Sequence, residues 1–528
     1  MPDDLKPADF TDILRQIVGA DRVSDDLATR ELLSQDIWSK GQAVCDVVAS
    51  PADTEALARA IEAAAAQGYG LAIRGGGMSY TNGYVPGQDK ALTLDLSRMD
   101  RVLRVDAEAM TVTVEAGCTW KTLYETLKPL GLRTPFWGPL SGIWSTIGGG
   151  LSQLNAVFGS GHYGTTSESV VGLTVILADG QVLRTGARTN AGEAFYRHYG
   201  PDLTGLFCGD CGVFGVKAEI TLRLIRVPAA EAYASFAFKT RTDCVEAMAE
   251  IARAGLACEM FGFDPQLARA RLKRASLMSD VKALGKVISK QGSLLKGMKE
   301  AAKIAMAGRT FVGEEDYSIH VVCEGRSQAA VDADLAAARA IAKGFNGLEI
   351  ENTIPKVVRA MPFTPLNNIL GPGGERWVPV HGVVSHAVAD QVYADVEALF
   401  ASLAPEFERH GVEVGYMLTT LATNGFLIEP VFFWPEARMP IHDATIEPAF
   451  LAKLDRHEPN PETTALVAKA RRAVIDVFVR HGAAHFQIGR TYPYRDNRDP
   501  ASVALLDAIK RQLDSKNALN AGVLGFGE

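Results

Sequence analysis

The stretch Arg-Gly-Gly-Gly-Met-Ser-Tyr-Thr-Asn-Gly occupies residues 74–83, at the end of a run, 71–74, that predicts a β-strand. Three consecutive glycines allow backbone N–H groups to converge on an anion, because no Cβ atom stands in the way. Arg74 and Ser79 can add donors to phosphate oxygens. The loop lacks the Lys-Ser/Thr ending of a nucleotide-hydrolase loop. It predicts a phosphate-binding loop, with a plain tight turn as the alternative.

Three more glycine clusters follow along the chain. They are WGPLSGIWSTIGGGLSQ at 137–153, GSGHYGTTSESVVGLTVILADGQVLRTG at 159–186 and LFCGDCGVFGVKAEITLRL at 206–224. Residues 159–164 have the spacing G-x-G-x-x-G, but they lead into a predicted strand, whereas the Rossmann fingerprint opens a helix. We therefore reject a Rossmann NAD site. Several glycine-lined segments along one extended ligand indicate a large dinucleotide held without a helix dipole.

The composition is that of an ordinary globular protein. The chain has 528 residues, 47% hydrophobic and 22% charged, and can bury a large core without disulfides or metals. Its net charge of −8 disfavours a general nucleic-acid binder. We find no apolar run of the ~18 residues that span a membrane, and the acidic start MPDDLKPADF predicts no secretion signal. Seven cysteines favour reduced thiols, so we expect a cytoplasmic protein.

The rhythm of predicted elements changes near residue 226. Before it, many short strands alternate with helices without a repeating βαβ series; residues 1–45 are expected to be helical, and the elements 47–50, 53–67 and 71–74 follow. After it, longer strands and helices alternate as in a split βαβ sandwich. The expected strands there are 234–238, 258–263, 318–323, 378–384, 414–421 and 426–433. The expected helices are 244–253, 328–343, 388–409 and 461–480.

Four sequence elements, taken in order, resemble the vanillyl-alcohol oxidase / p-cresol methylhydroxylase superfamily of FAD-linked oxidases, which includes D-lactate and glycolate dehydrogenases. They are the loop 74–83, the stretch 139–164, the pair 172–186 and 202–224, and the ending LDSKNALNAGVLG at 513–525. The resemblance implies an α+β fold, with a two-part FAD-binding domain of the p-cresol methylhydroxylase type and a cap domain whose antiparallel sheet is covered by helices. It implies an FAD-binding domain at 1–225, a substrate-binding cap at 226–480, and a C-terminal segment, 481–528, that returns to the FAD and active site.

FAD is the cofactor that this resemblance implies, and the motif residues carry over by position. The residues expected to hold the pyrophosphate are Arg74, Gly75, Gly76, Gly77, Ser79 and Tyr80. The residues expected to line the flavin and ribityl chain are Pro139, Ser141, Thr146, Gly148, Gly149, Asn155, Gly159, Tyr163 and Gly164. The residues expected at the adenine or isoalloxazine side are Gly212, Gly215 and Val216.

Departures from the family pattern refine the cofactor prediction. Some relatives attach FAD through a histidine in the first loop or a cysteine in the second stretch, and here those places hold Met78, Ser141 and Gly142. We therefore predict non-covalent FAD. The hydroxy-acid dehydrogenases carry H-x-G-D-G-N-x-H where this chain has LTTLATNGFLIEP at 418–430. Because both histidines are missing, we expect no metal site.

The segment HGAAHFQIGRTYPYRDN at 481–497 corresponds to a part of the family that supplies active-site residues. His485 resembles the histidine of an "EHGIG" type of relative. We predict His485 as the base for a substrate hydroxyl, Arg490 as an anion or oxyanion partner and Tyr494 as a hydroxyl donor. The alternative for His485 is a packed, hydrogen-bonded histidine. The tyrosine–arginine pair of phenol oxidases maps onto Ala484 and His485, which argues against phenol oxidation.

These patterns predict an FAD-dependent oxidoreductase, a dehydrogenase or oxidase acting on CH–OH. Its expected substrate is a small molecule, a 2-hydroxy acid or an aromatic or other alcohol, that passes a hydride to flavin N5. The electron acceptor is oxygen, a quinone or a cytochrome, and a homo-oligomer remains open. One alternative is a flavin-dependent, non-redox exchange like that of alkylglycerone-phosphate synthase. Another is a basic-surfaced binding protein with a vestigial flavin site.

A basic stretch at residues 269–309 suggests a further partner. It holds eleven Lys and Arg residues against Asp280 and Glu300, with apolar residues interleaved. Such a pattern favours an amphipathic surface for anionic lipid or an acidic partner. The alternative is a set of helices with a solvated basic face. Peripheral contact with the inner face of the membrane is therefore a hypothesis.

Overall fold

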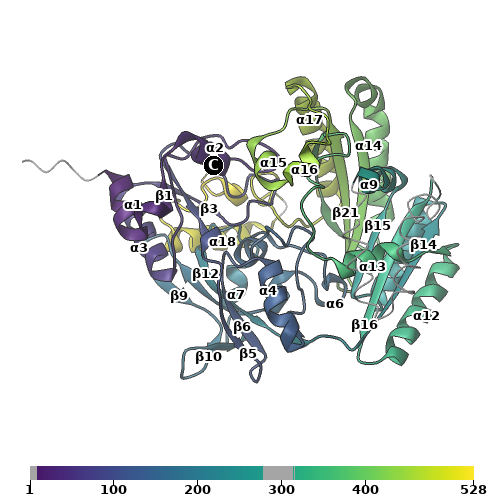
Figure 1. Cartoon of the computed structure of the whole chain (residues 1–528), viewed down its shortest axis with the longest axis horizontal. Helices are drawn as coiled ribbons and strands as arrows, with labels where there is room; N and C mark the ends of the chain where they lie inside the picture. The colour runs from purple at the N-terminus through teal and green to yellow at the C-terminus, as the bar shows by residue number, and fades with distance from the viewer. Residues whose placement is uncertain (1–8, 278–312, 314, 497, 528) are drawn as a thin grey trace, which may run out of the picture. The chain divides into compact units, whose positions relative to one another are not determined.

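The computed structural model describes residues 9–277, 313, 315–496 and 498–527, and the chain divides into two compact units (Figure 1). The first unit comprises Met1–Ala156, Thr165–Val227 and Phe486–Glu528. The second comprises Val157–Gly164 and Pro228–His485. Two short segments, 157–164 and 481–485, therefore group with the second unit, although the expected ranges placed them elsewhere.

The first unit contains two main sheets. One has the order β1 (Val23–Ser24), β2 (Val47–Ala49), β4 (Ala91–Asp95), β3 (Gly70–Arg74), with β2, β4 and β3 parallel. The other is antiparallel, with the order β5 (Val102–Asp106), β6 (Thr111–Glu115), β12 (Val216–Arg223), β8 (Val170–Ile176), β9 (Val182–Arg184). Helix α3 (Thr54–Gln67) links β2 to β3. Asp53 caps its start, and Gly68 ends it in the left-handed conformation.

The first unit also contains further helices and two separate pairs of strands. The helices are α1 (Phe10–Val18), α2 (Leu27–Leu33), α4 (Trp120–Leu127), α5 (Ile147–Gln153), α7 (Leu203–Leu206) and α18 (Pro500–Leu513). The strand pairs are β7 (Leu132–Arg133) with β13 (Ile225–Arg226), and β10 (Ala187–Arg188) with β11 (Ala194–Tyr196).

The C-terminal motif lies beside strand β3, which leads into the glycine loop. Leu71 donates its N–H to the carbonyl of Ala518 at 2.8 Å, and Asn520 donates to the carbonyl of Leu71 at 2.9 Å. The Asn520 side chain accepts from the N–H of Ile73 at 3.0 Å and donates to the carbonyl of Cys211 at 2.7 Å. Segments that are more than 300 residues apart are thus joined by one asparagine.

The second unit is built on one antiparallel sheet. Its order is β17 (Leu348–Ile350), β14 (Ala230–Phe238), β16 (Tyr317–Gly325), β15 (Glu259–Phe263), β20 (Glu413–Leu421), β21 (Gly425–Trp434), β18 (Arg376–Pro379), and β19 (Gly382–Ser385) also pairs with β21. Its longer helices are α8 (Arg241–Arg253), α9 (Pro265–Leu277), α12 (Gln328–Gly344), α13 (Thr353–Ala360), α14 (Ala389–His410) and α17 (Pro461–Arg480). Its shorter helices are α6 (Ser160–Tyr163), α15 (Pro440–Thr445) and α16 (Pro448–Leu451). The expected antiparallel sheet covered by helices is confirmed.

The two faces of this sheet differ in chemistry. Helices α8, α12, α14 and α17 cover an apolar face; the Phe400 ring, for example, packs edge-on against Phe432 at 5.6 Å. The strand register places Glu259, His320, Glu324 and Glu429 on the opposite face, because directly paired residues point the same way. Helices α9 and α13 pack on that face. Ionisable groups are therefore concentrated on one side of the sheet.

The structure bears only in part on two sequence predictions, the absence of a membrane-spanning segment and the basic surface at 269–309. Among the helices of the described residues, none is both long and apolar enough to span a bilayer. Most of the basic stretch 269–309 lies outside the described residues, because residues 278–312 are not among them. The expected lipid or acidic partner of that stretch stays a prediction.

Candidate functional site

The loop after β3 presents a row of backbone donors. Within the described part of the chain, the N–H groups of the five consecutive residues 75–79 donate to no protein acceptor. Gly77 and Ser79 are buried, and buried N–H groups normally have a partner. A run of N–H groups of this kind forms a concavity that suits an anion. The loop therefore fits the pyrophosphate of FAD.

The loop glycines are required by close packing rather than by an open cavity. A Cβ atom on Gly76 would stand 1.8 Å from the carbonyl oxygen of Trp144, and one on Gly75 would stand 2.3 Å from the hydroxyl of Thr146. Gly77 has φ +70°, which favours glycine. The segment 144–146 thus presses directly on the loop and fixes the direction of its N–H groups.

Arg74 makes contacts within the protein. Its side chain is buried, donates to the carbonyl of Gln35 at 2.7 Å, and lies over the Tyr84 ring at 4.9 Å. The Ser79 hydroxyl pairs with the Thr81 hydroxyl at 3.1 Å. Tyr80 is buried, and its hydroxyl accepts from the Gln487 amide at 3.4 Å. These contacts of Arg74 and Ser79 hold the loop in shape, and the expected donation of both side chains to phosphate oxygens stays a prediction.

The second glycine cluster has its N–H groups already bonded. At the start of α5, Ile147 donates to the carbonyl of Cys118, Gly148 to that of Ala116, and Gly149 to the hydroxyl of Thr146. A Cβ atom on Gly148 would stand 2.7 Å from that of Ala116. This cluster therefore packs the start of α5 against the turn that follows β6.

Ser141 and Asn155, both expected to line the flavin and ribityl chain, lie on either side of α5 in the sequence. The Pro139 carbonyl accepts from the N–H of Gly142. The Ser141 carbonyl, in the next turn, accepts from the N–H groups of Trp144 and Ser145. Asn155 is buried, its side-chain oxygen accepts from the Thr166 hydroxyl, and its Nδ2 has no acceptor among the described residues. A buried amide donor without a partner suits a ligand acceptor. Asn155 is thus a candidate contact for the cofactor.

Residues 157–164 hold three of the expected cofactor residues, and all three lie in the second unit. The segment is attached through Gly159, which donates its N–H to the Glu259 carboxylate at 3.1 Å. Gly161 donates to the carbonyl of Cys258 at 2.8 Å, and Gly164 donates to that of Ser160 at 3.0 Å. Tyr163 donates its N–H to the carbonyl of Gly159 at 2.9 Å.

The fourth cluster forms a buried support behind the loop. The Lys217 ammonium pairs with Asp210, and Gly212 at φ +77° donates to the same carboxylate at 3.1 Å. A Cβ atom on Gly215 would stand 2.4 Å from the Val175 side chain. Val216 is fully buried and pairs with Ile176. The Gly215 and Val216 positions are therefore explained by packing of β12 on β8.

The two cysteines of this cluster are not thiolates. Cys208 donates to the carbonyl of Thr204 at 3.2 Å, and Cys211 to the Gln153 side chain at 3.6 Å. Burial raises the pKa of each thiol to about 12. Neither can act as a nucleophile near neutral pH.

Arg490 and Tyr494 belong to the first unit and are engaged there. The two terminal nitrogens of Arg490 donate to the carbonyls of Asn82, Val85 and Ala521, at 2.5, 3.1 and 2.5 Å. These bonds tie the end of the glycine loop to the C-terminal motif. The Tyr494 ring lies 4.0 Å from the Arg498 guanidinium, and burial raises the pKa of its hydroxyl. The structure thus gives Arg490 a structural task, and its expected oxyanion role stays a prediction.

His485 is the last residue of the second unit and is held by the strand β19 region. Ala484 pairs with Val383, and the His485 Nδ1 lies 2.8 Å from the carbonyl oxygen of His381. Because a carbonyl only accepts, Nδ1 carries the proton and Nε2 carries the lone pair. Burial lowers the pKa of His485 to about 4. The imidazole is therefore neutral at pH 7, and its basic atom is Nε2, the ring nitrogen that does not bind the His381 carbonyl.

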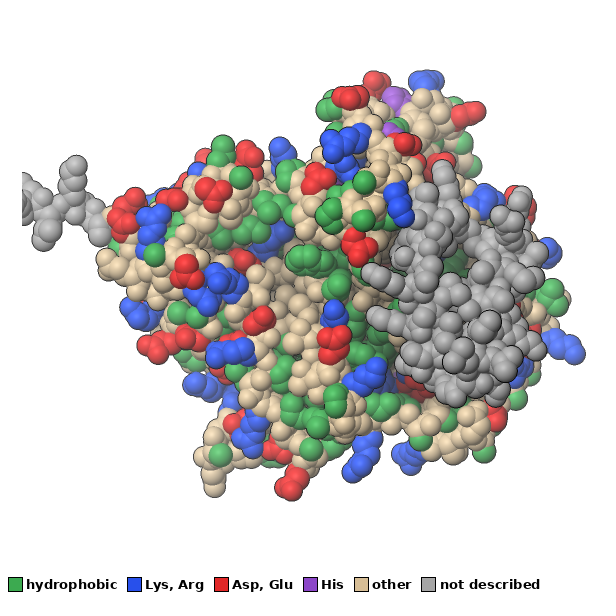
Figure 2. Space-filling model, viewed as in Figure 1, with side chains coloured by type: hydrophobic (Ala, Val, Ile, Leu, Met, Phe, Trp, Pro, Cys, Tyr) green, Lys and Arg blue, Asp and Glu red, His purple; other side chains and the backbone are tan. Residues whose placement is uncertain are grey.

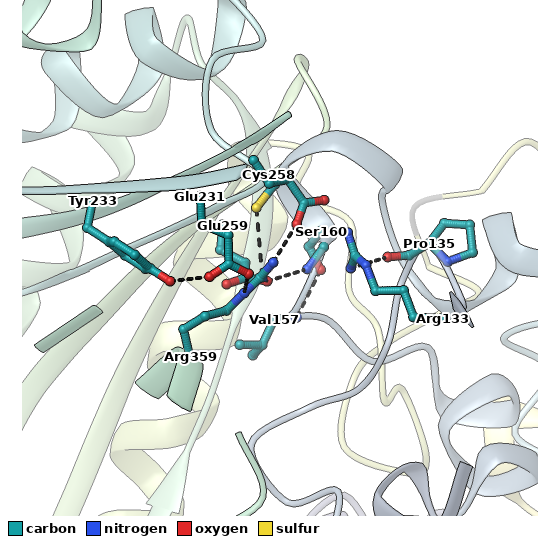
Figure 3. A network of polar contacts seen from close by, with 11 residues as sticks. Arg133, Pro135, Val157, Ser160, Glu231, Tyr233, Cys258, Glu259 and Arg359 are labelled. Atoms are coloured by element: carbon teal, nitrogen blue, oxygen red, sulfur yellow. Dashed lines mark hydrogen bonds and ion pairs between the residues drawn. The ribbon is translucent and has the colours of Figure 1, made fainter. Parts of the chain in front are cut away.

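Sequence reasoning missed the strongest ion-pair network of the second unit. The sequence offers Arg359 and Arg438 only as lone arginines that could bind a carboxylate. In the structure, Arg359 is 7% exposed and pairs with Glu231 and Glu259 (Figure 3) and with Glu324. Glu429 also escaped notice; burial raises its pKa to about 7. No sequence signal marks either group, because their partners come from distant strands. Among the described residues, no three His, Cys, Asp or Glu side chains are grouped as a metal site would need.

Comparison with known proteins identifies one domain of the chain. Residues 45–186 match a family described as FAD binding domain. Glycolate oxidase subunit GlcD of Bacillus subtilis is 30% identical over 220 residues, which are 42% of this chain and 45% of that protein. This chain therefore spans less than half the length of that relative.

Solved structures share the fold over almost the whole chain. P-cresol methylhydroxylase with substrate bound has a TM-score of 0.71 at 17% identity, covering 98% of this chain and 96% of that one. Alkyldihydroxyacetonephosphate synthase has a TM-score of 0.70 at 16% identity, covering 98% and 86%. Identities this low show the fold alone. The sequence match at residues 45–186 identifies an FAD-binding domain in this chain, and FAD is its cofactor.

Proposed function

We propose that this protein is an FAD-dependent oxidoreductase that oxidises the CH–OH group of a small hydroxylated molecule, with His485 as the base. One observation carries the proposal. The Nδ1–H of His485 is committed to the carbonyl of His381, and burial keeps the ring neutral. Nε2 is then free of a proton of its own and can take one from a substrate hydroxyl. The alternative, a packed histidine, shares the same contact and is separated by experiment.

The chain holds FAD without a covalent bond in this proposal, because Met78, Ser141 and Gly142 stand where relatives use histidine and cysteine. The N–H groups of 75–79 bind the pyrophosphate, and the Asn155 amide donates to the cofactor. FAD, when bound, supplies the hydride acceptor. The residues of the chain bind, orient and move the proton.

A 2-hydroxy acid is the substrate class that we favour, because the relative from Bacillus subtilis is a glycolate oxidase subunit. An aromatic alcohol is the second candidate, supported by the fold of p-cresol methylhydroxylase. The electron acceptor, whether oxygen, a quinone or a cytochrome, and the oligomeric state remain predictions from the sequence.

The decisive experiment follows the visible spectrum of the purified holoprotein under anaerobic conditions. D-2-hydroxy acids are added first and aromatic alcohols second. We expect the flavin absorbance near 450 nm to bleach with a 2-hydroxy acid, on the order of the change that dithionite gives. Bleaching with the alcohols alone would overturn the substrate class. Bleaching with neither would overturn the redox proposal in favour of a non-redox exchange. A colourless protein that takes up no FAD would leave only a vestigial site.

The base assignment has a matched control on the same turn. His485→Ala is compared with His481→Ala, since His481 pairs with Asp395 at 2.7 Å in an ion pair that is partly exposed. We expect His485→Ala to slow flavin reduction by about 100-fold or more, and His481→Ala by less than about threefold. Equal rates in the two variants would show that His485 is only a packed histidine.

A further inference from the structure

The connection between β21 and α15 gathers arginine and histidine side chains within the second unit. Arg376, on β18, is buried and donates from Nη1 to the carbonyl of Ala437 at 3.4 Å. Arg438 is the next residue of the connection, and its side chain is 9% exposed. His442, on α15, is fully buried. Two guanidinium groups and one imidazole are therefore brought to a single short piece of chain.

The His442 imidazole is oriented by the backbone of the same connection. Its Nδ1 accepts the N–H of Met439 at 3.0 Å. Burial, followed by the charges of Arg376 and Arg438, lowers the pKa of His442 to about 3. The ring is therefore neutral at pH 7, and its one proton is on Nε2. That buried Nε2–H has no acceptor within the described residues.

Arg438 carries a second buried donor without an acceptor. Its Nη1 has none in the part of the chain that the structure describes. Its Nε lies 3.8 Å from Asp443, which is too long for a hydrogen bond, and the Asp443 side chain is 58% exposed. The Glu436 carboxylate, two residues before Arg438, accepts from the N–H of Asn460 at 3.0 Å and from the Thr464 hydroxyl at 2.6 Å. Because buried polar groups normally have a partner, a buried guanidinium N–H without one suits a ligand anion.

We propose that Arg438 and His442 form a binding site for a carboxylate group, with Arg376 adding positive charge beside it. Two N–H donors on two side chains match the two oxygens of a carboxylate. A phosphate would bury further oxygens for which this pair has no donor, and a buried polar atom without a partner is costly. The ligand class is therefore a small monocarboxylate.

The strand register separates this site from the base of the proposed function. Arg376 pairs with Trp434, whereas Val380, the residue before His381, donates its N–H to the carbonyl of Pro430. Four residues of an antiparallel strand span roughly 14 Å. The carboxylate site is thus a further site on the same sheet, and it depends on neither the flavin nor a substrate hydroxyl.

The test measures acetate binding to the holoprotein by saturation-transfer NMR, with sodium chloride holding the ionic strength constant. Arg438→Met removes the charge and the donors. Arg472→Met is the matched control, because Arg472 is 59% exposed and pairs with Asp476 within α17. We expect the Kd for acetate to rise at least about tenfold in Arg438→Met and to stay within about twofold in Arg472→Met. No acetate binding by the unchanged protein, or an equal Kd in Arg438→Met, would overturn the proposal.

General attraction of anions to the surface is a separate effect that the control removes. On the face that Figure 2 shows, Lys and Arg side chains are intermixed with Asp and Glu over the described surface. Inorganic phosphate is therefore added as a competitor at the concentration of acetate. We expect it to displace less than about a fifth of the bound acetate. Full displacement would overturn the assignment to a carboxylate.

A second variant keeps the test decisive if Arg438→Met fails to fold. Arg438→Lys retains the positive charge but loses the planar pair of guanidinium nitrogens. We expect the Kd for acetate to rise by about threefold or more. An unchanged Kd would show that charge alone holds the anion and would overturn the donor geometry. No measurement here uses turnover, so failure of the oxidoreductase proposal would be seen separately.

Discussion

Two glycine-rich segments of this protein have similar compositions and opposite backbone chemistry. In the loop of the first unit, the N–H groups of residues 75–79 have no acceptor in the described part of the chain. In the segment 157–164 of the second unit, Gly159, Gly161 and Gly164 all donate to protein oxygens. Glycine is needed in both segments because neighbouring backbone comes too close for a Cβ atom. Only the first segment can offer its N–H groups to an anion.

A glycine cluster therefore indicates that another part of the protein packs closely against the backbone. Whether that neighbouring part accepts the glycine N–H groups decides whether they remain available for a ligand. Around 75–77 the neighbour is the segment 144–146, which leaves the N–H groups pointing elsewhere. Around 159–161 the neighbours are the Glu259 carboxylate and the carbonyl of Cys258, and they accept the N–H groups of Gly159 and Gly161. One segment therefore acts as a donor loop and the other as a held scaffold.

Gly76→Ala should break the donor loop with the largest effect. The added methyl group would stand 1.8 Å from the Trp144 carbonyl oxygen, so the loop or the segment 144–146 must move. We expect FAD affinity to fall by about 100-fold or more, measured by fluorescence titration of the deflavinated protein. Gly344→Ala, at the end of α12, is the control, because its methyl group would meet nothing within 4 Å. Full FAD affinity in Gly76→Ala would show that the loop is not a donor site.

Gly161→Ala should disturb the held scaffold with an intermediate effect. Its methyl group would stand 2.3 Å from the Ala257 carbonyl oxygen and would push the segment away from the sheet. Because no donor to the anion is lost, we expect FAD affinity to fall by only about tenfold, with faster deuterium exchange at 157–164. A loss as large as that in Gly76→Ala would remove the distinction between the two segments.

Ser79→Ala should separate the backbone of the donor loop from its side chains. The Ser79 hydroxyl is paired with Thr81 at 3.1 Å, and the N–H of Ser79 survives the substitution. We therefore expect FAD affinity to fall by less than about threefold in the same titration. A tenfold loss would instead place the hydroxyl among the groups that bind the pyrophosphate.

The smallest effect expected is that of pH on flavin reduction, because His485 titrates far below neutrality. Burial lowers its pKa to about 4, so the base is present above that pH and is lost as the pH falls through it. The rate of flavin reduction should change by less than about twofold between pH 4.5 and 8, measured by stopped flow with the holoprotein. A midpoint near 6.5, the ordinary value for histidine, would mean that another group or a solvated His485 is the base.

The elements of the fold were largely predictable from local pattern. The expected helix 461–480 is α17 to the residue, and the expected strands 258–263 and 426–433 are β15 and β21 to within a residue or two. Alternation of apolar residues and capping residues fixes such elements locally. The expected strand 378–384 is wrong in one respect, since β18 ends at Pro379 and β19 begins at Gly382. Proline has no N–H to continue a ladder.

The candidate site was predictable only in outline. The motif order indicated FAD, but it showed neither the inward contacts of Arg74 nor the carboxylates that Arg359 binds. Arg74 turns inward because Gln35 and Tyr84 meet it there. Arg359 depends on carboxylates from three strands, β14, β16 and β15, that lie 35 to 128 residues away in sequence. Partners at such separations leave no periodic trace in the chain.

The sequence by itself determined the secondary-structure elements and the glycine segments, because strand alternation, helix caps and missing Cβ atoms are local properties. The resemblance of its motifs to those of FAD-linked oxidases indicated the fold class and the cofactor. Tertiary structure decided which of those segments keeps its N–H groups for a ligand. It also decided that the Nδ1 proton of His485 is given to the carbonyl of His381. Hydrogen bonding and burial depend on what distant parts of the chain bring together, and those contacts set the chemistry of each residue.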